Sequence, residues 1–495
     1  MSTDVLEELD VLLRTRYGIV VIDSPEDDRV ETLLRHAAAR RGLPLFLWSR
    51  TRGLRRHDAD NAVYDTQAAD KALAHIEAAN LPALYHMRRL TDGLSDDRAL
   101  ATRLEEAGRL LTAHEGAIVL SGSGIALPES MRGIAALLRL PPPGPTDYRR
   151  LLDAVLKDVA ARMHVRVELA GEDRERLVAN LRGLTLMEAE KILTRAIVED
   201  GRLAASDIEK VIEAKKRVVE QEGILEYYPA DTPMSAIADM RGLKKWLEER
   251  RAIVHDGARA EQFGLRFPRG ILLLGVPGCG KSLCAKAVAQ DWGLPLLKLD
   301  TANLYNKYVG ESERNFKRAM STSERMAPVV LWIDEVEKAF ATGGEDGGVS
   351  QRVLGNFLSW MQDRAGDVFV VATANDVTRL PAEFLRKGRF DEIFFVDLPD
   401  AETRADIFRI HLERRNQAAG SFDVARLVDA TPDFSGAEIE QAVVAALFTC
   451  FAAKQPLTTE AIAAEIETTR PLAVTMAERV TQMRDWARER TRPAN

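Results

Sequence analysis

The chain has 495 residues, a formal net charge of −8 at pH 7 and a sequence pI near 5.7. Proteins that depend on nucleic acid usually carry a basic face, so this acidity argues against nucleic acid as a partner. No uncharged apolar run approaches the roughly 20 residues that cross a bilayer, and residues 1–10 lack the basic-then-apolar order of a secretory signal. The three cysteines show no metal-ligand spacing, which fits a reducing compartment. We therefore expect a cytoplasmic protein without membrane contact, built from two or more domains.

The first half of the chain begins with an apolar strand at residues 18–22. The loop after it, residues 23–30, has no glycine and is rich in acids. From residue 33 to residue 57 there are seven arginines and no acid. This segment either contacts an acidic partner or forms a solvated face that is salt-bridged within an assembly. The stretch 141–145 is too rich in proline for a helix or a central strand, and helical periodicity follows it.

The most specific motif lies at residues 270–282. An apolar strand, 271–274, runs into a glycine-rich turn that closes with Gly280, Lys281 and Ser282. Glycines let successive backbone N–H groups approach anionic oxygens, and the helix that follows adds its positive end. We expect Lys281 to neutralise the β- and γ-phosphates of a nucleotide and Ser282 to ligate Mg²⁺. The predicted cofactor-binding residues of this phosphate loop are Gly275, Val276, Pro277, Gly278, Cys279, Gly280, Lys281 and Ser282.

A second strand pattern, residues 329–333, delivers two acids at its carboxyl end, where open α/β sheets bind ligands. Asp334 is expected to hold the magnesium through its water shell. Glu335 is expected to polarise the attacking water. A solvated acid pair at the end of a strand is the plainer interpretation, and the phosphate loop upstream disfavours it.

Three further motifs follow in order. The apolar strand 368–371 leads to Asn375, which can bridge the γ-phosphate and the lytic water. Arg386 and Arg389 flank a glycine, and their planar guanidinium groups suit a phosphate whose charge spreads in the transition state. Each of these would also fit an ordinary surface turn. Ser435, with an acid three residues later, is typical of a helix N-cap and opens a helix of a small lid.

Together these motifs resemble the AAA ATPase module over about residues 230–470. The resemblance implies a doubly wound nucleotide domain with a helical lid, assembled as a ring, usually hexameric, with ATP at each subunit interface. It implies ATP and Mg²⁺ as cofactors and nucleotide roles for Lys281 and Ser282. The catalytic residues that it implies are Glu335, Asn375, Arg386 and Arg389. The two arginines would then reach the ATP of a neighbouring subunit.

The stretches 354–363 and 384–399 most closely resemble a poorly characterised AAA group, known as a hypothetical open reading frame of plastid and cyanobacterial genomes and of other bacteria. Two positions depart from the wider AAA pattern. The adenine-contacting loop, usually Ile-Gly-Gly, reads Ile-Ala-Asp at residues 237–239, so base affinity can differ. Lys387 stands where many relatives have proline.

Tyr308 is a candidate substrate contact. In ring remodellers that resemble this chain, the aromatic residue before Val-Gly faces the central pore and grips a polypeptide, and Tyr308 occupies that position. A rigid amphipathic ring suits the role. Packing of Tyr308 against the following helix explains the residue equally well.

The two halves of the chain repeat each other with the period of a whole domain. Seven residues of the first half recur unchanged, without a gap, 250 positions later. They are Asp173, Arg176, Leu177, Val178, Glu188, Glu190 and Ala196, which match Asp423, Arg426, Leu427, Val428, Glu438, Glu440 and Ala446. The competing explanation is that any two α/β units share such patterns.

The first copy has lost the residues of the nucleotide site. Its loop 23–30 lacks glycine, and the acids there would repel a triphosphate. Arg88 and Arg89 stand opposite Asp334 and Glu335 when the two halves are aligned. We therefore predict an α/β protein of tandem AAA-type modules, each a doubly wound parallel sheet followed by a small helical lid, the first module being degenerate.

The predicted domains are a degenerate AAA-like α/β domain without phosphate loop (1–140), its helical lid (146–224), the catalytic α/β domain (230–400), its lid (401–470) and a C-terminal helix (471–495). The predicted function is ATP hydrolysis at the subunit interfaces of a homo-oligomer, a hexameric ring, that remodels an unidentified protein client. The alternative is a nucleotide-controlled assembly switch or scaffold whose inactive N-terminal half recruits partners.

Overall fold

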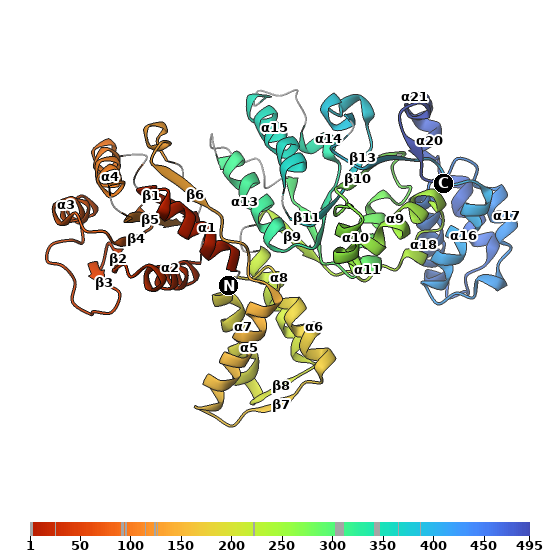
Figure 1. The fold of residues 1–495 in the computed structure, drawn as a ribbon. Coiled ribbons are helices and arrows are strands. Elements are labelled where there is room, and N and C mark those ends of the chain that lie inside the picture. Colours follow the sequence, from red (N-terminus) through yellow and green to blue (C-terminus); the bar gives the residue numbers. More distant parts are fainter. Residues whose placement is uncertain are drawn as a thin grey trace. The chain divides into compact units, whose positions relative to one another are not determined.

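The structure is a computed structural model that describes residues 3–24, 26–90, 94, 97–113, 115–122, 125, 127–220, 223–301, 311–340, 347–364, 366–386 and 388–495. The chain divides into two compact units, Met1–Val211 and Ile212–Asn495 (Figure 1). Along the described residues, none of the helices combines the length and the apolar character needed to cross a membrane.

Six of the described strands of the first unit form a sheet in the order β3-β2-β4-β5-β1-β6. Its strands are β1 (Ile19–Asp23), β2 (Leu45–Ser49), β3 (Gly53–Arg56), β4 (Leu84–Arg88), β5 (Ala117–Gly122) and β6 (Ala135–Leu138). Neighbouring strands pair in parallel, except β3, which runs antiparallel to β2. The helices are α1 (Thr3–Arg14), α2 (Asp27–Arg41), α3 (Ala69–Ala79) and α4 (Arg98–Leu111).

Alternation along each strand divides the core of this sheet between two faces. Val20 and Ile22 of β1 pack with apolar residues of α1 and α2, whereas Ile19 and Val21 pack with those of α3 and α4. Both faces are therefore covered by helices, which is the doubly wound arrangement.

The rest of the first unit is mainly helical (Figure 1). It contains α5 (Pro145–Ala160), α6 (Gly171–Leu181), α7 (Leu186–Asp200) and two short parallel strands, β7 (Arg166–Glu168) and β8 (Arg202–Ala204). Helix α8 (Asp207–Glu220) follows. The proline-rich stretch ends inside α5, because Pro145 occupies the first helical position, where no intrahelical N–H bond is lost.

The described strands of the second unit form a sheet in the order β15-β14-β10-β13-β12-β11-β9. They are β9 (Leu225–Tyr228), β10 (Gly270–Gly275), β11 (Leu296–Leu299), β12 (Val329–Ile333), β13 (Val368–Ala374), β14 (Glu392–Val396) and β15 (Arg492–Pro493). Its helices include α9 (Arg241–His255), α10 (Gly257–Gln262), α11 (Lys281–Trp292), α13 (Glu311–Arg325), α14 (Val336–Ala339) and α15 (Gly347–Asp363). Ile271 and Leu273 of β10 pack toward α9 and α11, and Leu272 and Leu274 toward α13 and α15.

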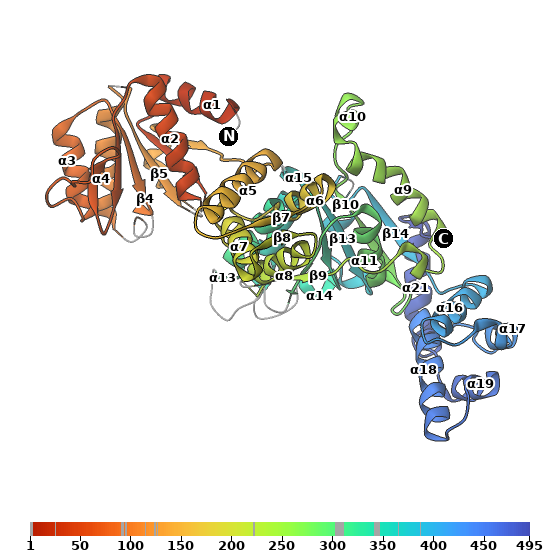
Figure 2. The same cartoon turned by 90° about the horizontal axis from the view of Figure 1, so that it is seen from below.

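A helical group follows β14 and is seen clearly in Figure 2. It consists of α16 (Ala401–Glu413), α17 (Val424–Asp429), α18 (Gly436–Ala452) and α19 (Thr459–Thr468), with a core of its own that includes Phe408, Leu427 and Ile439. The chain ends with α20 (Leu472–Thr475), α21 (Ala477–Arg488) and β15. The sequence had indicated a C-terminal helix only. The edge strand β15 and the break between α20 and α21 were not predicted.

Five parallel strands follow the same order in the two sheets, β2-β4-β5-β1-β6 in the first unit and β11-β12-β13-β10-β14 in the second, where β15 adds a further parallel strand at the edge. An identical order requires the same series of crossovers, so the likeness of the two halves extends well beyond the repeated residues. The predicted fold class is confirmed. The strand-to-helix loop differs: residues 276–280 separate β10 from α11, but only residues 24–26 separate β1 from α2.

Candidate functional site

The glycine-rich loop of the second unit connects β10 to α11, as the sequence predicted. Gly275, Gly278 and Gly280 have φ angles of +145°, +80° and +84°. A Cβ at Gly275 would lie 1.9 Å from the carbonyl oxygen of Val396, and one at Gly278 would lie 2.8 Å from Ser435 Oγ. Only glycine meets both the backbone and the packing demands at these positions.

Lys281 begins α11 and is 5% exposed. Its Nζ donates hydrogen bonds of 2.9 Å and 2.7 Å to the carbonyl oxygens of Gly275 and Val276. Burial lowers the pKa of Lys281 to about 8, against the opposing influence of neighbouring acidic groups. The loop therefore holds a buried amine whose charged form an anion would stabilise.

Ser282 and Asp334 meet beside the loop. Ser282 Oγ donates a 3.0 Å hydrogen bond to Asp334 Oδ1, and Thr373 Oγ1 donates one of 2.6 Å to the same oxygen. A hydroxyl next to a carboxylate suits Mg²⁺, which keeps several waters and uses few protein ligands beside the phosphates of its nucleotide. The sequence analysis assigned Thr373 no role, although its place two residues before Asn375, on the same face of the strand end, could have suggested one.

Glu335 and Asn375 also come together. Asn375 Nδ2 donates a 3.1 Å hydrogen bond to Glu335 Oε1, and Lys338 Nζ lies 2.6 Å from Glu335 Oε2. Glu335 has a left-handed backbone, with φ of +49°, which turns its side chain out of the strand direction. The backbone N–H of Asn375 donates to Glu337 Oε1 at 2.9 Å. Burial raises the pKa of Glu337, a residue that the sequence analysis missed.

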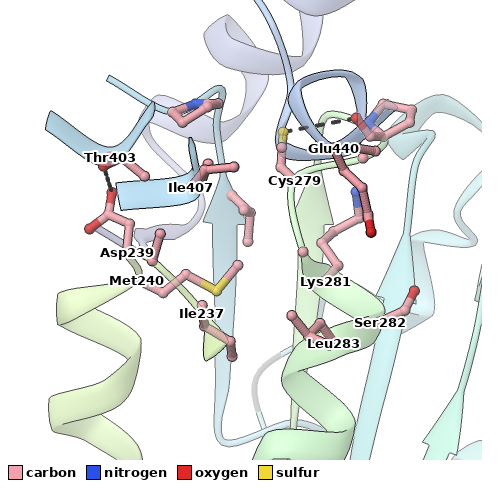
Figure 3. A pocket seen from close by; sticks show the side chains of 18 of the residues that line it. Ile237, Asp239, Met240, Cys279, Lys281, Ser282, Leu283, Thr403, Ile407 and Glu440 are labelled. Carbon is pink, nitrogen blue, oxygen red and sulfur yellow. Dashed lines mark hydrogen bonds between the residues drawn. The ribbon is translucent and has the colours of Figure 1, made fainter. Parts of the chain in front are cut away.

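These groups border a cavity of about 400 Å³ that continues to the predicted base-binding loop. Figure 3 shows Lys281 and Ser282 on one side of the cavity and Asp239 and Met240 on the other. Thr403 Oγ1 donates a 3.0 Å hydrogen bond to Asp239 Oδ2, which ties α16 to that loop. The further lining residues include Ala236, Ile237, Ala238, Pro277, Gly278, Cys279, Gly280, Asp334, Glu335, Thr373, Asn375, Ile407, His411, Gly436 and Glu440.

His411 and Glu440 were not predicted for this site. Their side chains lie 3.5 Å apart at the lid side of the cavity, between His411 Nδ1 and Glu440 Oε1. Burial lowers the pKa of His411, although the charge of Glu440 acts in the opposite direction. Because α16 and α18 contribute one residue each, no local spacing in the sequence could have paired them.

Arg386 and Arg389 are not among the residues that line this cavity. Arg386 is exposed. Arg389 Nη1 donates to the carbonyl oxygen of Glu383, within the same turn. Their contact with a phosphate of another subunit stays a prediction.

Two further residues that the sequence analysis named are Cys279 and Tyr308. Burial raises the pKa of Cys279 to about 12, so its thiol stays protonated and is a poor candidate for a reactive thiolate. Tyr308 lies outside the described residues, so its predicted contact with substrate is untested.

The corresponding place in the first unit carries inverted charges. Asp27 begins α2, where α11 has Lys281, and Arg88 ends β4, near the position at which Asp334 follows β12. Arg88 forms an ion pair with Glu31 of α2. Arg89 and Glu335 share a left-handed backbone, with φ of +50° and +49°.

In the first unit, a carboxylate from the loop between β1 and α2 lies at the start of α7. Glu26 Oε1 accepts a 3.0 Å hydrogen bond from the backbone N–H of Leu186, the first residue of α7, and Glu26 also pairs with Arg29. In the second unit the matching helix α18 bonds instead to the phosphate loop, from Ala437 N–H to the carbonyl oxygen of Gly278 at 3.0 Å. An internal carboxylate thus occupies a helix N-terminus that could otherwise bind an anion.

Comparisons with known proteins agree with this geometry. Residues 271–398 match the model of the "ATPase family associated with various cellular activities (AAA)". Residues 5–140 match the N-terminal domain, and residues 147–222 the second domain, of the "SpoVK-like AAA ATPase" models.

Similarity over nearly the whole chain is found with two proteins that share one name. The "Uncharacterized AAA domain-containing protein ycf46" of Pyropia yezoensis is 33% identical over 486 residues, which cover 97% of each chain. The protein of the same name from Trieres chinensis is 34% identical over 97% of this chain and 96% of its own. The proteasome-activating nucleotidase of Pyrococcus furiosus is 33% identical over 44% of this chain and 57% of its own.

The chain therefore belongs to the AAA family of ATPases. Within that family it is similar over 97% of its length to ycf46 AAA proteins, as the stretches 354–363 and 384–399 had indicated.

Proposed function

We propose that the second unit binds ATP with Mg²⁺ and hydrolyses it. The observation that carries this proposal is the meeting of three groups at one cavity: Lys281 in the phosphate loop, the Ser282–Asp334 pair and the Glu335–Asn375 pair. Each of these groups matches one requirement of phosphoryl transfer, namely charge neutralisation, metal ligation and orientation of the nucleophile.

In this proposal Lys281 leaves the carbonyl oxygens of the loop for the β- and γ-phosphates. Ser282 and Asp334 hold Mg²⁺, which supplies neutralisation of the phosphate charge when it is bound. Glu335 accepts a hydrogen bond from the attacking water and draws its proton away. Asn375 fixes the carboxylate of Glu335 and the same water.

We further propose that Arg386 and Arg389 complete the site of a neighbouring copy in a homo-oligomeric ring, six copies being the expected number. Their absence from the lining of the cavity in their own chain supports this. A guanidinium group at the γ-phosphate contributes on the order of 10³ to 10⁵ in rate, so an isolated copy would turn over slowly.

We propose that ATP hydrolysis drives the remodelling of a protein client in the cytoplasm and that Tyr308 grips this client. The domains predicted from the sequence are part of this proposal: 230–400 and 401–470 hydrolyse ATP, while 1–140 and 146–224 have lost that chemistry. The C-terminal segment is 471–495.

The alternative, a nucleotide-controlled switch or scaffold, is favoured by one observation. The first unit carries Asp27 and Arg88 with inverted charges, and Glu26 caps its lid helix, so this unit is suited to contacts other than nucleotide. Tyr308→Ala separates the two functions. It should abolish work on a client but keep ATP hydrolysis under the first function, and change neither under the second.

The test of the hydrolysis itself is a steady-state assay of phosphate release. Lys281→Ala should abolish ATP turnover, whereas Lys245→Ala, which removes an exposed lysine of α9, should not change it. Wild-type protein without turnover above the Lys281→Ala variant, at concentrations that allow assembly, would refute the proposal.

A further inference from the structure

The C-terminal segment contacts the candidate site from several sides. Val480 and Met483 of α21 pack on Val276 of the phosphate loop. The backbone N–H of Leu472 donates a 2.7 Å hydrogen bond to Glu438 Oε1 at the start of the lid helix α18. Ala494, beside β15, is fully buried. This segment is therefore integral to the second unit and is not a loose tail.

One contact of α21 reaches the catalytic candidates. Arg479 forms an ion pair with Asp376, the residue that follows Asn375. Asp376 is 6% exposed and also accepts hydrogen bonds of 3.0 Å and 2.6 Å from the backbone N–H and Oγ1 of Thr378. Arg379 Nε also lies 3.4 Å from Asp376 Oδ2, but this contact is longer than that of Arg479 and comes from a mostly exposed side chain. A buried carboxylate is costly unless it is paired, so removing the guanidinium group of Arg479 weakens the bonding that holds this turn.

The turn that Asp376 anchors is the one that aims Asn375. The side chain of Asn375 donates to Glu335 Oε1 at 3.1 Å, and its backbone N–H donates to Glu337 Oε1 at 2.9 Å. A continuous series of bonds therefore runs from α21 through Asp376 and Asn375 to Glu335. A shift of the turn would move the amide of Asn375 relative to the carboxylate of Glu335.

The same groups border a second cavity, of about 310 Å³, next to the nucleotide cavity. Its walls include Glu335, Glu337, Asn375, Arg479 and Met483. Glu337 is 3% exposed, and its Oε2 has no hydrogen-bond partner among the described residues. The end of α21 that carries Arg479 thus lies at the side of the site where Asn375 and Glu335 meet.

We propose that Arg479 is a positioning residue for ATP hydrolysis, which holds Asp376 and thereby keeps Asn375 aimed at Glu335. This rests on the proposed function of the second unit. It also gives α21 a defined role, since any displacement of this helix would shift Asn375, the group that orients the attacking water.

The experiment compares Arg479→Ala and Arg479→Lys with Arg488→Ala. Arg488 lies on the same helix, exposed, and pairs only with Asp485 among the described residues, so its removal is a matched loss of charge. Arg479→Ala should lower kcat on the order of 10-fold, with KM for ATP nearly unchanged, because misaligned catalytic groups cost rate and not nucleotide binding. Arg479→Lys should recover part of kcat, and Arg488→Ala should behave as wild type.

Two further measurements make the result decisive. Asp376→Asn should lower kcat at least as much as Arg479→Ala does, because it removes the charge that pairs with both Arg479 and Arg379. The double variant should be no worse than Asp376→Asn, since Arg479 acts only through Asp376. Hydrogen exchange of residues 372–380, measured without nucleotide, should be faster in Arg479→Ala than in Arg488→Ala. Equal exchange, or a higher KM with unchanged kcat, overturns the role of Arg479. Absence of turnover in the wild type would instead refute the proposed function, and the exchange comparison would still decide whether Arg479 holds the turn.

Discussion

Asn375 Nδ2 donates a 3.1 Å hydrogen bond to Glu335 Oε1, while Lys338 lies 2.6 Å from the other carboxylate oxygen. Both oxygens of Glu335 are thus engaged by protein donors. If Glu335 activates the attacking water as proposed, this water must replace one of these donors or share an oxygen with it. In the proposed reaction, the geometry of this carboxylate therefore matters as well as its charge.

The first prediction concerns Glu335→Gln. The amide keeps the size of the side chain but is a very weak base, so we expect kcat for ATP to fall by at least about 100-fold. The affinity for ATP should stay within about threefold of wild type, because Glu335 is not expected to contact the phosphates directly. Phosphate release and equilibrium nucleotide binding measure the two quantities, with Glu248→Gln on the exposed face of α9 as control.

The ATP affinity expected for Glu335→Gln also offers a way to identify the client. A variant that retains ATP should hold the oligomer and any client in one state, so affinity purification with Glu335→Gln is the direct route to the client. Weak ATP binding by this variant, or turnover close to that of wild type, would contradict the role assigned to Glu335.

The sequence predicted the parts of the site that are local. The phosphate loop is defined by glycines within a few residues, and Asp334 and Asn375 lie at the ends of apolar strands, where parallel sheets gather their functional residues. The repeat of residues 173–196 at 423–446 also led correctly to a second sheet with the same strand order.

The remaining parts depend on contacts between distant segments. Arg479 and Asp376 are 103 residues apart, and His411 and Glu440 come from different helices of the lid. Glu26 meets Leu186 across 160 positions. No periodicity or motif specifies such pairs, because they arise only when helices dock. The sequence therefore could not predict the side-chain pairs that depend on tertiary packing.

A second prediction tests whether the site is completed by another copy. A variant lacking both Arg386 and Arg389 keeps its own Lys281, and a Lys281→Ala variant keeps its arginines. Each alone should be nearly inactive. Mixed together, they should recover part of the ATPase rate, because some interfaces then combine an intact loop with intact arginines.

The mixing experiment is read by phosphate release at fixed total protein. As a control, wild-type rate per copy should fall on dilution as the oligomer dissociates. A mixture as inactive as its components, or a double arginine variant with the full rate, would show that Arg386 and Arg389 do not act on a neighbour.

A third prediction follows from the pKa of Lys281, which burial lowers to about 8. Bound phosphate favours the charged amine and raises this pKa. Above pH 8, binding of ATP is therefore coupled to the uptake of a proton by Lys281. The affinity for ATP should therefore be nearly constant just below pH 8 and fall by up to about tenfold for each pH unit above it.

Calorimetric binding of ATP at pH 7.5, 8.5 and 9.5 measures this dependence. Lys281→Arg is the matched control, because a guanidinium group stays charged over the whole range and its affinity, though weaker, should not follow the pH. The idea is wrong if wild-type affinity does not change over this range, or if the arginine variant shows the same slope.

The last prediction concerns the stability of the first unit. His86 on β4 is fully buried, and burial lowers its pKa to about 4, although the charge of Asp27 acts in the opposite direction. Its Nε2 lies 2.8 Å from Ser121 Oγ, which donates to Asp27 Oδ1 at 2.9 Å. The unfolded chain binds a proton at its ordinary pKa near 6.5, so the contribution of neutral His86 is complete above pH 6.5 and is lost as the pH falls toward 4.

Native-state hydrogen exchange of β4 gives the free energy of opening at each pH. Between pH 7 and pH 5 this free energy should fall by about 2 kcal/mol in the wild type, because pH 5 lies 1.5 units below the histidine pKa of the unfolded chain. His86→Gln keeps a polar side chain beside Ser121 but does not titrate, so its decrease should be less than half as large. The same pH slope in both proteins would mean that other groups, and not His86, set the acid sensitivity of this sheet.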